Sequence, residues 1–296
     1  METAYPRIKQ LTPGPRHSLS GGLKDWQAPP LRLGETERLR FRNMIYDYPQ
    51  YYEVAFSFRD IPKEAAFLRA CIDRHSKIDV SWVFEVGCGF APHAEELIKA
   101  GYRYLGLDKN RNMLDYAVSK WRHLEPRPDF IEGDMIAFQT PRPVDFAFVM
   151  LGSLYLNTRE EMNSHFNSLA RALHPGGLYF LDWCVQFDDP MRYADNNSVT
   201  FERDGISVAS RFNIRLTDPT EQMYEEIWTL DVNDRGRRRT LQMTERNRAI
   251  APRDFLDFVR NRSDFEFVGW WRDWNLYQPI TDTAEITRPV ALLRRR

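Results

Sequence analysis

Two glycines and one acid have the spacing that most clearly suggests chemistry. Gly87 and Gly89 lie between a predicted strand and a predicted helix, and Asp108 ends the next predicted strand, about 20 residues along the chain. Glycine lets the backbone turn sharply and approach a ligand, and an acid at the second strand can accept hydrogen bonds from both hydroxyls of a ribose. This arrangement predicts a binding site for a cofactor that contains adenosine.

Two features argue against a nicotinamide cofactor and a dehydrogenase. Pro92 occupies the position of the third glycine in G-x-G-x-x-G, the residue that lets helix and strand pack closely in that motif. The paired glycines Gly176 and Gly177 stand before the fifth predicted strand, which is also unlike a dehydrogenase. Another adenosine-containing cofactor is therefore favoured.

The glycine turn resembles a motif of a known family. The segment Glu85-Val86-Gly87-Cys88-Gly89 is similar to the first motif of class I S-adenosylmethionine-dependent methyltransferases: acid, any residue, glycine, any residue, glycine. Asp108 is similar to the ribose-binding acid of that family. Later motifs follow in the family's order: Gly133-Asp134-Met135 resembles the adenine-binding corner, Leu151-Gly152-Ser153-Leu154 the cofactor-lining loop, and His174-Pro175-Gly176-Gly177 the turn before the fifth strand. The resemblance covers roughly residues 46 to 296. Ala91 departs from it, since many relatives have glycine there, and this leaves the conformation of the turn open.

The resemblance implies S-adenosylmethionine as the cofactor, no metal, and no particular catalytic residue. It assigns cofactor binding to Glu85, Gly87, Cys88, Gly89, Asp108, Lys109, Asp134, Met135 and Leu151. Two of these have a second interpretation. Aspartate is favoured at helix N-termini, so Asp134 could also cap a following helix, and Cys88 is interpreted as a packing residue rather than a nucleophile.

Methyl transfer depends mainly on positioning, so a dedicated base is not required by the chemistry. The candidates near the expected pocket are His93, Tyr155, His165 and His174. His93 could simply pack in the first helix, and Tyr155 could be a wall of the pocket. His165 and His174 are predicted to be surface or turn residues.

The sequence favours a small organic acceptor over nucleic acid. Residues 151–155 read Leu-Gly-Ser-Leu-Tyr, where nucleobase amino methyltransferases commonly carry an Asn/Asp-Pro-Pro-aromatic motif. Cys184 lacks the proline-cysteine context of the carbon-5 cytosine enzymes, and the arginines at 235 and 237–239 fit a solvated hairpin tip. We therefore expect methyl transfer to N or O of a small molecule. The alternatives are a non-catalytic S-adenosylmethionine-binding module and a tRNA or other nucleic-acid methyltransferase.

The elements that must position these residues alternate between strand and helix. Strands are predicted near 82–86, 103–108, 128–132, 144–150 and 177–183, and such alternation indicates a parallel sheet covered on both faces. A helix carrying Ala66, Phe67, Ala70 and Cys71 is predicted before the first strand. Thr158 and Glu161 form a capping-box pattern at the start of a helix that runs to about Leu173.

After Pro190 the apolar period changes to two, which is typical of half-exposed strands. Three such stretches predict an antiparallel meander, followed by a helix over about 252–262 and two strands near 265–274 and 288–295. The predicted fold class is α/β: a Rossmann-like, seven-stranded sheet with an antiparallel β meander inserted after the fifth strand. The predicted divisions are an N-terminal arm over 1–45, a cofactor-binding core over 46–190, the β insertion over 191–250 and the rest of the core over 251–296.

Composition sets wide limits on this interpretation. The 296 residues include 43% hydrophobic and 28% charged residues, which is ordinary for a globular protein. The 41 basic and 42 acidic residues nearly cancel, so no overall field attracts nucleic acid or an anionic membrane. Three scattered cysteines predict neither disulfides nor a zinc site. We expect a cytoplasmic protein with no membrane segment and a possible homo-oligomer through the β insertion.

Overall fold

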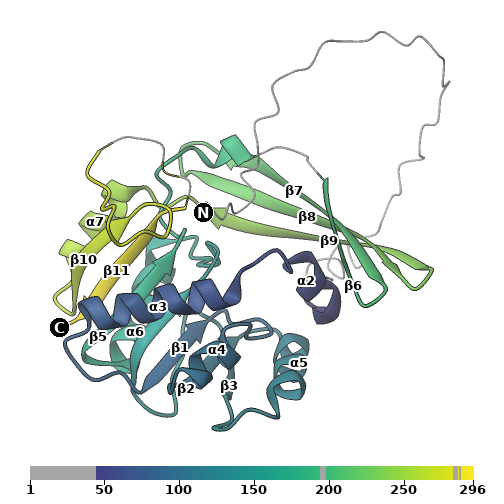
Figure 1. Cartoon of the computed structure of the whole chain (residues 1–296). Coiled ribbons are helices and arrows are strands. Elements are labelled where there is room, and N and C mark those ends of the chain that lie inside the picture. Colours follow the sequence, from purple (N-terminus) through teal and green to yellow (C-terminus); the bar gives the residue numbers. More distant parts are fainter. Residues whose placement is uncertain (1–44, 194–197, 283–285, 287) are drawn as a thin grey trace.

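The structure of the chain is a computed structural model that describes residues 45–193, 198–282, 286 and 288–296. Figure 1 shows two sheets, one covered by helices and one lying across its end. The arm predicted over residues 1–45 falls, except for Ile45, outside the described residues. Within the described part, no helix has both the length and the apolar character needed to cross a membrane.

The larger sheet has seven strands in the order β10-β11-β5-β4-β1-β2-β3. Its parallel part consists of β1 (Trp82–Val86), β2 (Arg103–Asp108), β3 (Asp129–Glu132), β4 (Val144–Val149) and β5 (Leu173–Asp182). The remaining strands, β10 (Phe265–Trp271) and β11 (Val290–Arg295), are antiparallel to each other, and β11 is antiparallel to β5. This topology confirms the predicted seven-stranded, Rossmann-like α/β fold. Because parallel strands end at the same edge, the residues after β1, β2, β4 and β5 meet there.

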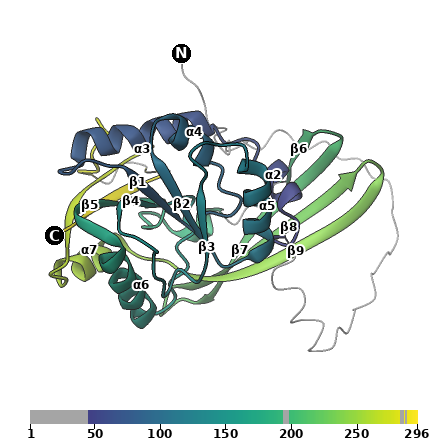
Figure 2. The same cartoon turned by 90° about the horizontal axis from the view of Figure 1, so that it is seen from below.

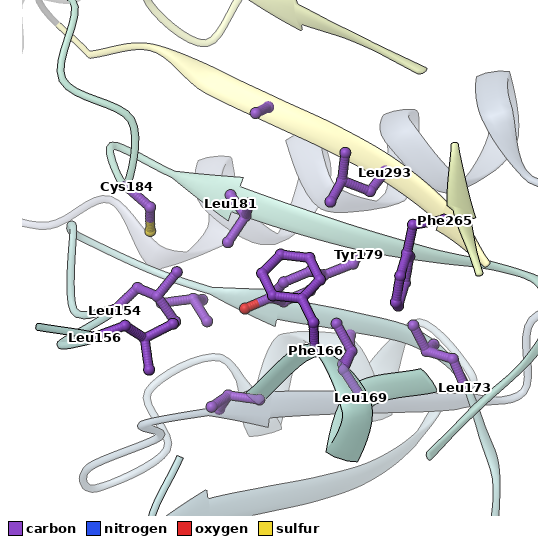
Figure 3. Packing of buried hydrophobic residues seen from close by; sticks show 14 of the residues in the cluster. Leu154, Leu156, Phe166, Leu169, Leu173, Tyr179, Leu181, Cys184, Phe265 and Leu293 are labelled. Atoms are coloured by element: carbon purple, nitrogen blue, oxygen red, sulfur yellow. The ribbon is translucent and has the colours of Figure 1, made fainter. Parts of the chain in front are cut away.

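Helices cover both faces of this sheet (Figure 2). One face carries α3 (Ile61–His75), α4 (Ala94–Lys99) and α5 (Arg111–Trp121), and the other carries α6 (Arg159–Ala172) and α7 (Pro252–Arg260). Figure 3 shows Phe166 and Leu169 of α6 packed against Tyr179 and Leu181 of β5. Burial of each such side chain contributes about 1.5–3 kcal/mol, so these two layers fix the sheet and hence its functional edge.

The helix α3 is confirmed, but its predicted apolar stripe is wrong by about one position. Leu68 and Ile72 are buried together with Cys71, whereas Ala66 and Ala70 are exposed. The larger side chains at i and i+4 remove more apolar surface from water than the two alanines, and they set the rotation of the helix.

The smaller sheet contains β6 (Ser198–Arg203), β7 (Ile206–Asp218), β8 (Met223–Asp234) and β9 (Arg237–Arg248), all antiparallel. It confirms the predicted meander after the fifth strand but has one strand more than predicted. The missed strand, β6, lies at the edge of the sheet and is almost wholly exposed, so it carries little apolar alternation.

The short helix α2 (Pro49–Ala55) packs under the small sheet (Figure 1). Tyr51 and Val54 of α2 lie in one apolar cluster with Leu230 and Leu241 of the sheet. In addition, the Tyr51 hydroxyl donates to Asp234 Oδ2 at 3.0 Å. The helix therefore anchors one end of the inserted sheet to the rest of the molecule.

The capping box of α6 provides a test of local stability. The Glu161 amide donates to Thr158 Oγ1 at 3.1 Å, and the Thr158 amide donates to Glu161 Oε2 at 3.3 Å. We expect Thr158→Ala to lower the free energy of unfolding by about 0.5–2 kcal/mol, measured by urea denaturation. Thr158→Ser keeps the accepting oxygen and should lose much less; equal losses in the two variants would contradict this role.

Candidate functional site

The glycine turn after β1 is fastened to the end of β2 by the Asp108 carboxylate. The Gly89 amide donates to Asp108 Oδ2 at 2.8 Å, and the Asn110 amide donates to Oδ1 at 2.8 Å. Gly87 and Gly89 have φ values of 69° and 54°, a region that favours glycine. Among the described residues, apart from the chain neighbours of Gly89, no atom lies within 4 Å of the position that a Gly89 Cβ would take. The backbone is therefore open to a ligand next to a carboxylate.

Asp108 keeps the capacity to accept further hydrogen bonds. Burial raises the pKa of its carboxyl, and the bonds from Asn110 and Gly89 lower it, with a net upward direction. Each carboxylate oxygen accepts one backbone bond, and an ionised carboxylate offers about four lone-pair positions in all. Both oxygens can thus accept a ligand hydroxyl in addition.

The second side of the turn faces Met135 and the loop after β4. A Cβ on Gly87 would lie 3.4 Å from Met135 Cε and 4.0 Å from the Ser153 carbonyl oxygen. The predicted residues Gly87, Gly89, Asp108 and Met135 are thus gathered at one edge of the sheet. Asp134 is exposed, and its Oδ1 accepts the Ile136 amide at 2.8 Å. Asp134 therefore caps a turn, and the alternative prediction that it caps a helix is wrong. Lys109 is also exposed.

The Cys88 side chain points away from the open side of the turn. It is buried, and its Sγ lies 2.7 Å from where a Cβ on Gly106 would stand, so only glycine fits on β2 at this point. Burial is the largest cause that raises the pKa of the thiol. This environment is suited to packing and not to a nucleophile.

Leu151 is held by a buried acid that the sequence analysis did not single out. Its amide donates to Asp182 Oδ2 at 2.8 Å, and its φ is 57°. Asp182 also accepts two hydrogen bonds from Arg288, at 2.8 and 2.6 Å, and one from Trp274 Nε1 at 2.9 Å. The loop that carries Leu151 is therefore fixed by charge from the C-terminal part of the chain.

Glu85 lies beneath the turn, within a network of buried charged groups. His93 Nδ1 is 2.8 Å from Glu85 Oε1, and His93 Nε2 is 3.0 Å from Glu64 Oε2. Burial lowers the pKa of His93, but the charge of Glu85 and the hydrogen bonds to Glu64 and Glu85 outweigh it and raise the pKa. Both ring nitrogens are engaged and the side chain is fully buried, so His93 positions the turn and does not reach an acceptor. Arg59, which also contacts Glu64 and His93, was likewise missed from the sequence.

The prediction that His165 is a surface or turn residue is wrong. The side chain is fully buried, with Nδ1 2.7 Å from the Met135 carbonyl oxygen and Nε2 2.8 Å from the Tyr179 hydroxyl. Burial lowers its pKa to about 4, so the ring is neutral and supports the Met135 corner. His174 is exposed, as predicted, and its Nδ1 is 2.8 Å from Asp145 Oδ1.

Tyr155 connects the loop after β4 to the inserted sheet through Glu226, a residue missed from the sequence. The Tyr155 hydroxyl donates to Glu226 Oε2 at 3.1 Å, and Asn247 Nδ2 lies 3.5 Å from Oε1. Burial raises the pKa of Glu226 to about 7. A signal did exist, because Glu226 interrupts the apolar alternation of Trp228, Leu230 and Val232 on β8.

Two sequence comparisons find similarity to methyltransferases. Residues 83–177 match the family model described as a methyltransferase domain. A cypemycin N-terminal methyltransferase from Streptomyces sp is 28% identical over 137 residues, which are 46% of this chain and 55% of that protein. The match thus spans about half the length of that relative.

Solved structures share the fold at low sequence identity. A methyltransferase from Clostridium acetobutylicum aligns with a TM-score of 0.68 and 15% identity over 82% of this chain and 95% of its own. A sugar N-methyltransferase from Streptoalloteichus sp aligns with a TM-score of 0.63 and 17% identity over 95% and 99% of the two chains. These likenesses establish the fold.

The strand order, with β11 antiparallel beside β5 and a glycine turn after β1, defines a Rossmann-like methyltransferase fold. The match of residues 83–177 to the family model for a methyltransferase domain agrees with this fold and shows that this segment is similar to methyltransferases.

Loss of the charge on Asp182 should destabilise the protein strongly. We expect Asp182→Asn to lower the free energy of unfolding by about 3–5 kcal/mol, because the mostly buried Arg288 then loses the carboxylate that it contacts at 2.6 Å, and its contact to Glu64 is longer, at 3.5 Å. Denaturant titration measures this loss. The exposed Asp257 forms long surface contacts to Arg253 and Arg260, both at 3.9 Å, and Asp257→Asn should cost less than about 1 kcal/mol. Similar losses for the two variants would refute the importance of the buried contacts.

The raised pKa of Glu226 predicts a pH-dependent cost to stability. Between its ordinary value of 4.5 and about 7, the folded protein binds more protons at this carboxyl than the unfolded chain does, so its contribution to stability falls as pH rises. We expect Glu226→Gln to be more stable than the wild type at about pH 8 by on the order of 1–3 kcal/mol, with the gain shrinking toward about pH 5. Thermal or urea unfolding across this range measures it. A difference that does not change with pH would show that Glu226 has an ordinary pKa.

Proposed function

We propose that this chain transfers a methyl group from S-adenosylmethionine to a nitrogen or oxygen atom of a small organic acceptor. The observation that carries the proposal is the Asp108 carboxylate, which is bonded to the glycine turn and retains acceptor capacity beside the open backbone of Gly89. The methyltransferase family model supports the same cofactor.

The groups gathered at the site suit an adenosylated sulfonium. Asp108 would accept the ribose hydroxyls, and the backbone around Gly87 and Gly89 would lie against the methionine part. Met135 and Leu151 would flank the cofactor from the ends of β3 and β4. The other residues predicted to bind the cofactor would have less direct roles. Glu85 and Cys88 would support the turn from its buried side, and Asp134 and Lys109 would contact the cofactor from the exposed side.

When bound, the cofactor supplies a methyl group that its positive sulfur already activates. The protein's part is to align the acceptor and to exclude water, and such positioning can contribute roughly 7–11 kcal/mol to lowering the barrier. The loop after β4 is well placed for alignment, because Asp182 holds Leu151 and Glu226 holds Tyr155.

A small-molecule or peptide acceptor is supported by the names of similar proteins, which include a sugar N-methyltransferase and an N-terminal methyltransferase. The alternatives from the sequence are a non-catalytic binding module and a nucleic-acid methyltransferase. A cytoplasmic location and a homo-oligomer through the inserted sheet remain proposals.

Calorimetry with S-adenosylmethionine, S-adenosylhomocysteine and NAD tests the cofactor. We expect both sulfur compounds to bind and NAD not to bind. Asp108→Ala should weaken binding of the sulfur compounds by about 1–3 kcal/mol, because the hydroxyls lose a charged acceptor. The exposed Asp115, on the nearby helix α5, supplies a matched control, Asp115→Ala, which should leave affinity unchanged.

Indifference of the wild-type protein to both sulfur compounds would refute the proposed function. Binding without transfer of labelled methyl to any member of a metabolite and tRNA mixture would instead favour the non-catalytic module, and label in tRNA would favour the nucleic-acid enzyme.

A further inference from the structure

The face of the inserted sheet that packs on the rest of the molecule changes from apolar to polar along its strands. At one end, Leu230, Leu241 and Met243 pack against α2. At the other end, Glu226 stands directly opposite Glu245 in the register of β8 and β9, with Tyr224 opposite Asn247 in the next inward-facing pair. Two carboxylates side by side on an inner face repel each other, so the apolar end serves anchoring and the polar end requires another explanation.

The described neighbours of Glu226 are polar or acidic. Its carboxylate receives hydrogen bonds from Tyr155 and Asn247, and Tyr224 is a further titratable neighbour. The other titratable groups that face it are Glu245 from β9 and Tyr46 from the segment before α2. Among the described residues, no lysine, arginine or histidine forms a salt bridge with Glu226. A half-buried carboxylate in such surroundings is suited to a cation that is not one of the described residues.

Contacts lead from Glu226 to the glycine turn by two routes. Tyr155, its hydrogen-bond donor, lies two residues after Ser153, whose carbonyl oxygen faces Gly87. On the second route, the rings of Tyr46 and Tyr52 are 5.6 Å apart, and the Tyr52 ring is 6.2 Å from that of Phe90, which follows Gly89. The charges of both Asp108 and Glu226 raise the pKa of Tyr46, after the larger effects of burial, Tyr52 and Glu245. The carboxylate therefore faces the same edge of the sheet as the cofactor site.

We propose that Glu226, held by Tyr155 and Asn247, binds the protonated amine of the methyl acceptor and takes the proton that this amine must lose. The acceptor is then a primary or secondary amine that is a cation at neutral pH, rather than an alcohol. This inference rests on the proposed methyltransferase function and assigns its substrate class.

The steps balance as follows. The acceptor ammonium gives one proton to the Glu226 carboxylate and becomes a neutral amine with a free lone pair. That lone pair forms a bond to the methyl carbon while the bond between this carbon and sulfur breaks, and the bonding electrons stay on sulfur. The products are a methylated ammonium and a neutral thioether, and Glu226 releases its proton to water.

The nearby alternatives are poorer bases. Burial raises the pKa of the Tyr155 and Tyr46 hydroxyls well above their usual range, so both stay protonated and act as donors. His93 and His165 are fully buried with both ring nitrogens engaged. A carboxyl whose pKa burial raises to about 7 is matched to a proton transfer near neutral pH.

A binding experiment tests this assignment without turnover. In sinefungin a carbon replaces the sulfur of the cofactor and carries a primary amine in the place of the sulfonium methyl group, whereas S-adenosylhomocysteine has no group there. We expect Glu226→Gln to weaken sinefungin binding about tenfold or more at neutral pH and to leave S-adenosylhomocysteine binding unchanged, measured by calorimetry on the full chain. The matched control is Glu225→Gln, because Glu225 is adjacent on β8 but on the opposite face, where it pairs with Arg215. Equal loss of both ligands, or no loss of either, would overturn the role of Glu226.

A turnover experiment separates this inference from the proposed function. Matched pairs of amines and alcohols on the same skeletons are incubated with labelled S-adenosylmethionine. We expect label only in amines, at least a 100-fold lower kcat/KM for Glu226→Gln, and a wild-type rate that rises with pH through about 7. Label in alcohols, or an unchanged rate and pH profile in Glu226→Gln, would overturn the inference and leave the methyltransferase function standing. Failure of the wild-type protein to bind either sulfur cofactor would overturn the proposed function itself. If no amine or alcohol is labelled, the comparison of sinefungin with S-adenosylhomocysteine decides whether Glu226 binds an amine.

Discussion

The shape of the candidate site depends on one carboxylate, that of Asp108. It accepts the amides of Gly89 and Asn110, which ties the glycine turn after β1 to the first residues beyond β2. The same group is the acceptor proposed for the ribose hydroxyls. Positioning and binding therefore use different lone pairs of the same side chain, and the turn is already formed before a ligand arrives.

Behind this edge, buried charges hold elements that are distant in sequence. Glu64 of α3 contacts His93 and Arg288, and Arg288 also bonds to Asp182 at the end of β5. Buried ion pairs give little net stability compared with apolar packing, but removing one partner is costly. Their effect here is geometric, because they fix the loop that carries Leu151 relative to the glycine turn.

The inserted sheet combines two roles along the same strands. Its apolar end, with α2 beneath it, follows the ordinary physics of burial. Its polar end places Glu226 and Tyr155 in contact at 3.1 Å, opposite the ends of the parallel strands. A rigid apolar anchor can hold a carboxylate at a defined place, at some cost to stability, even where none of the described residues is a cationic partner for it.

The sequence by itself determined the features that depend on local chemistry. The glycine turn, the capping box at Thr158, the seven strands and the period of the inserted meander follow from backbone preferences and side-chain periodicity. Only the tertiary structure decided that His165 is buried, that the inserted sheet has the additional strand β6, and which roles Asp182 and Glu226 have. The physical reason is sequence separation: Arg288 and Asp182 are 106 residues apart, and Tyr155 and Glu226 are 71 apart. Such partners become visible only when the sheet brings them together, because nothing in the neighbouring residues marks them as a pair.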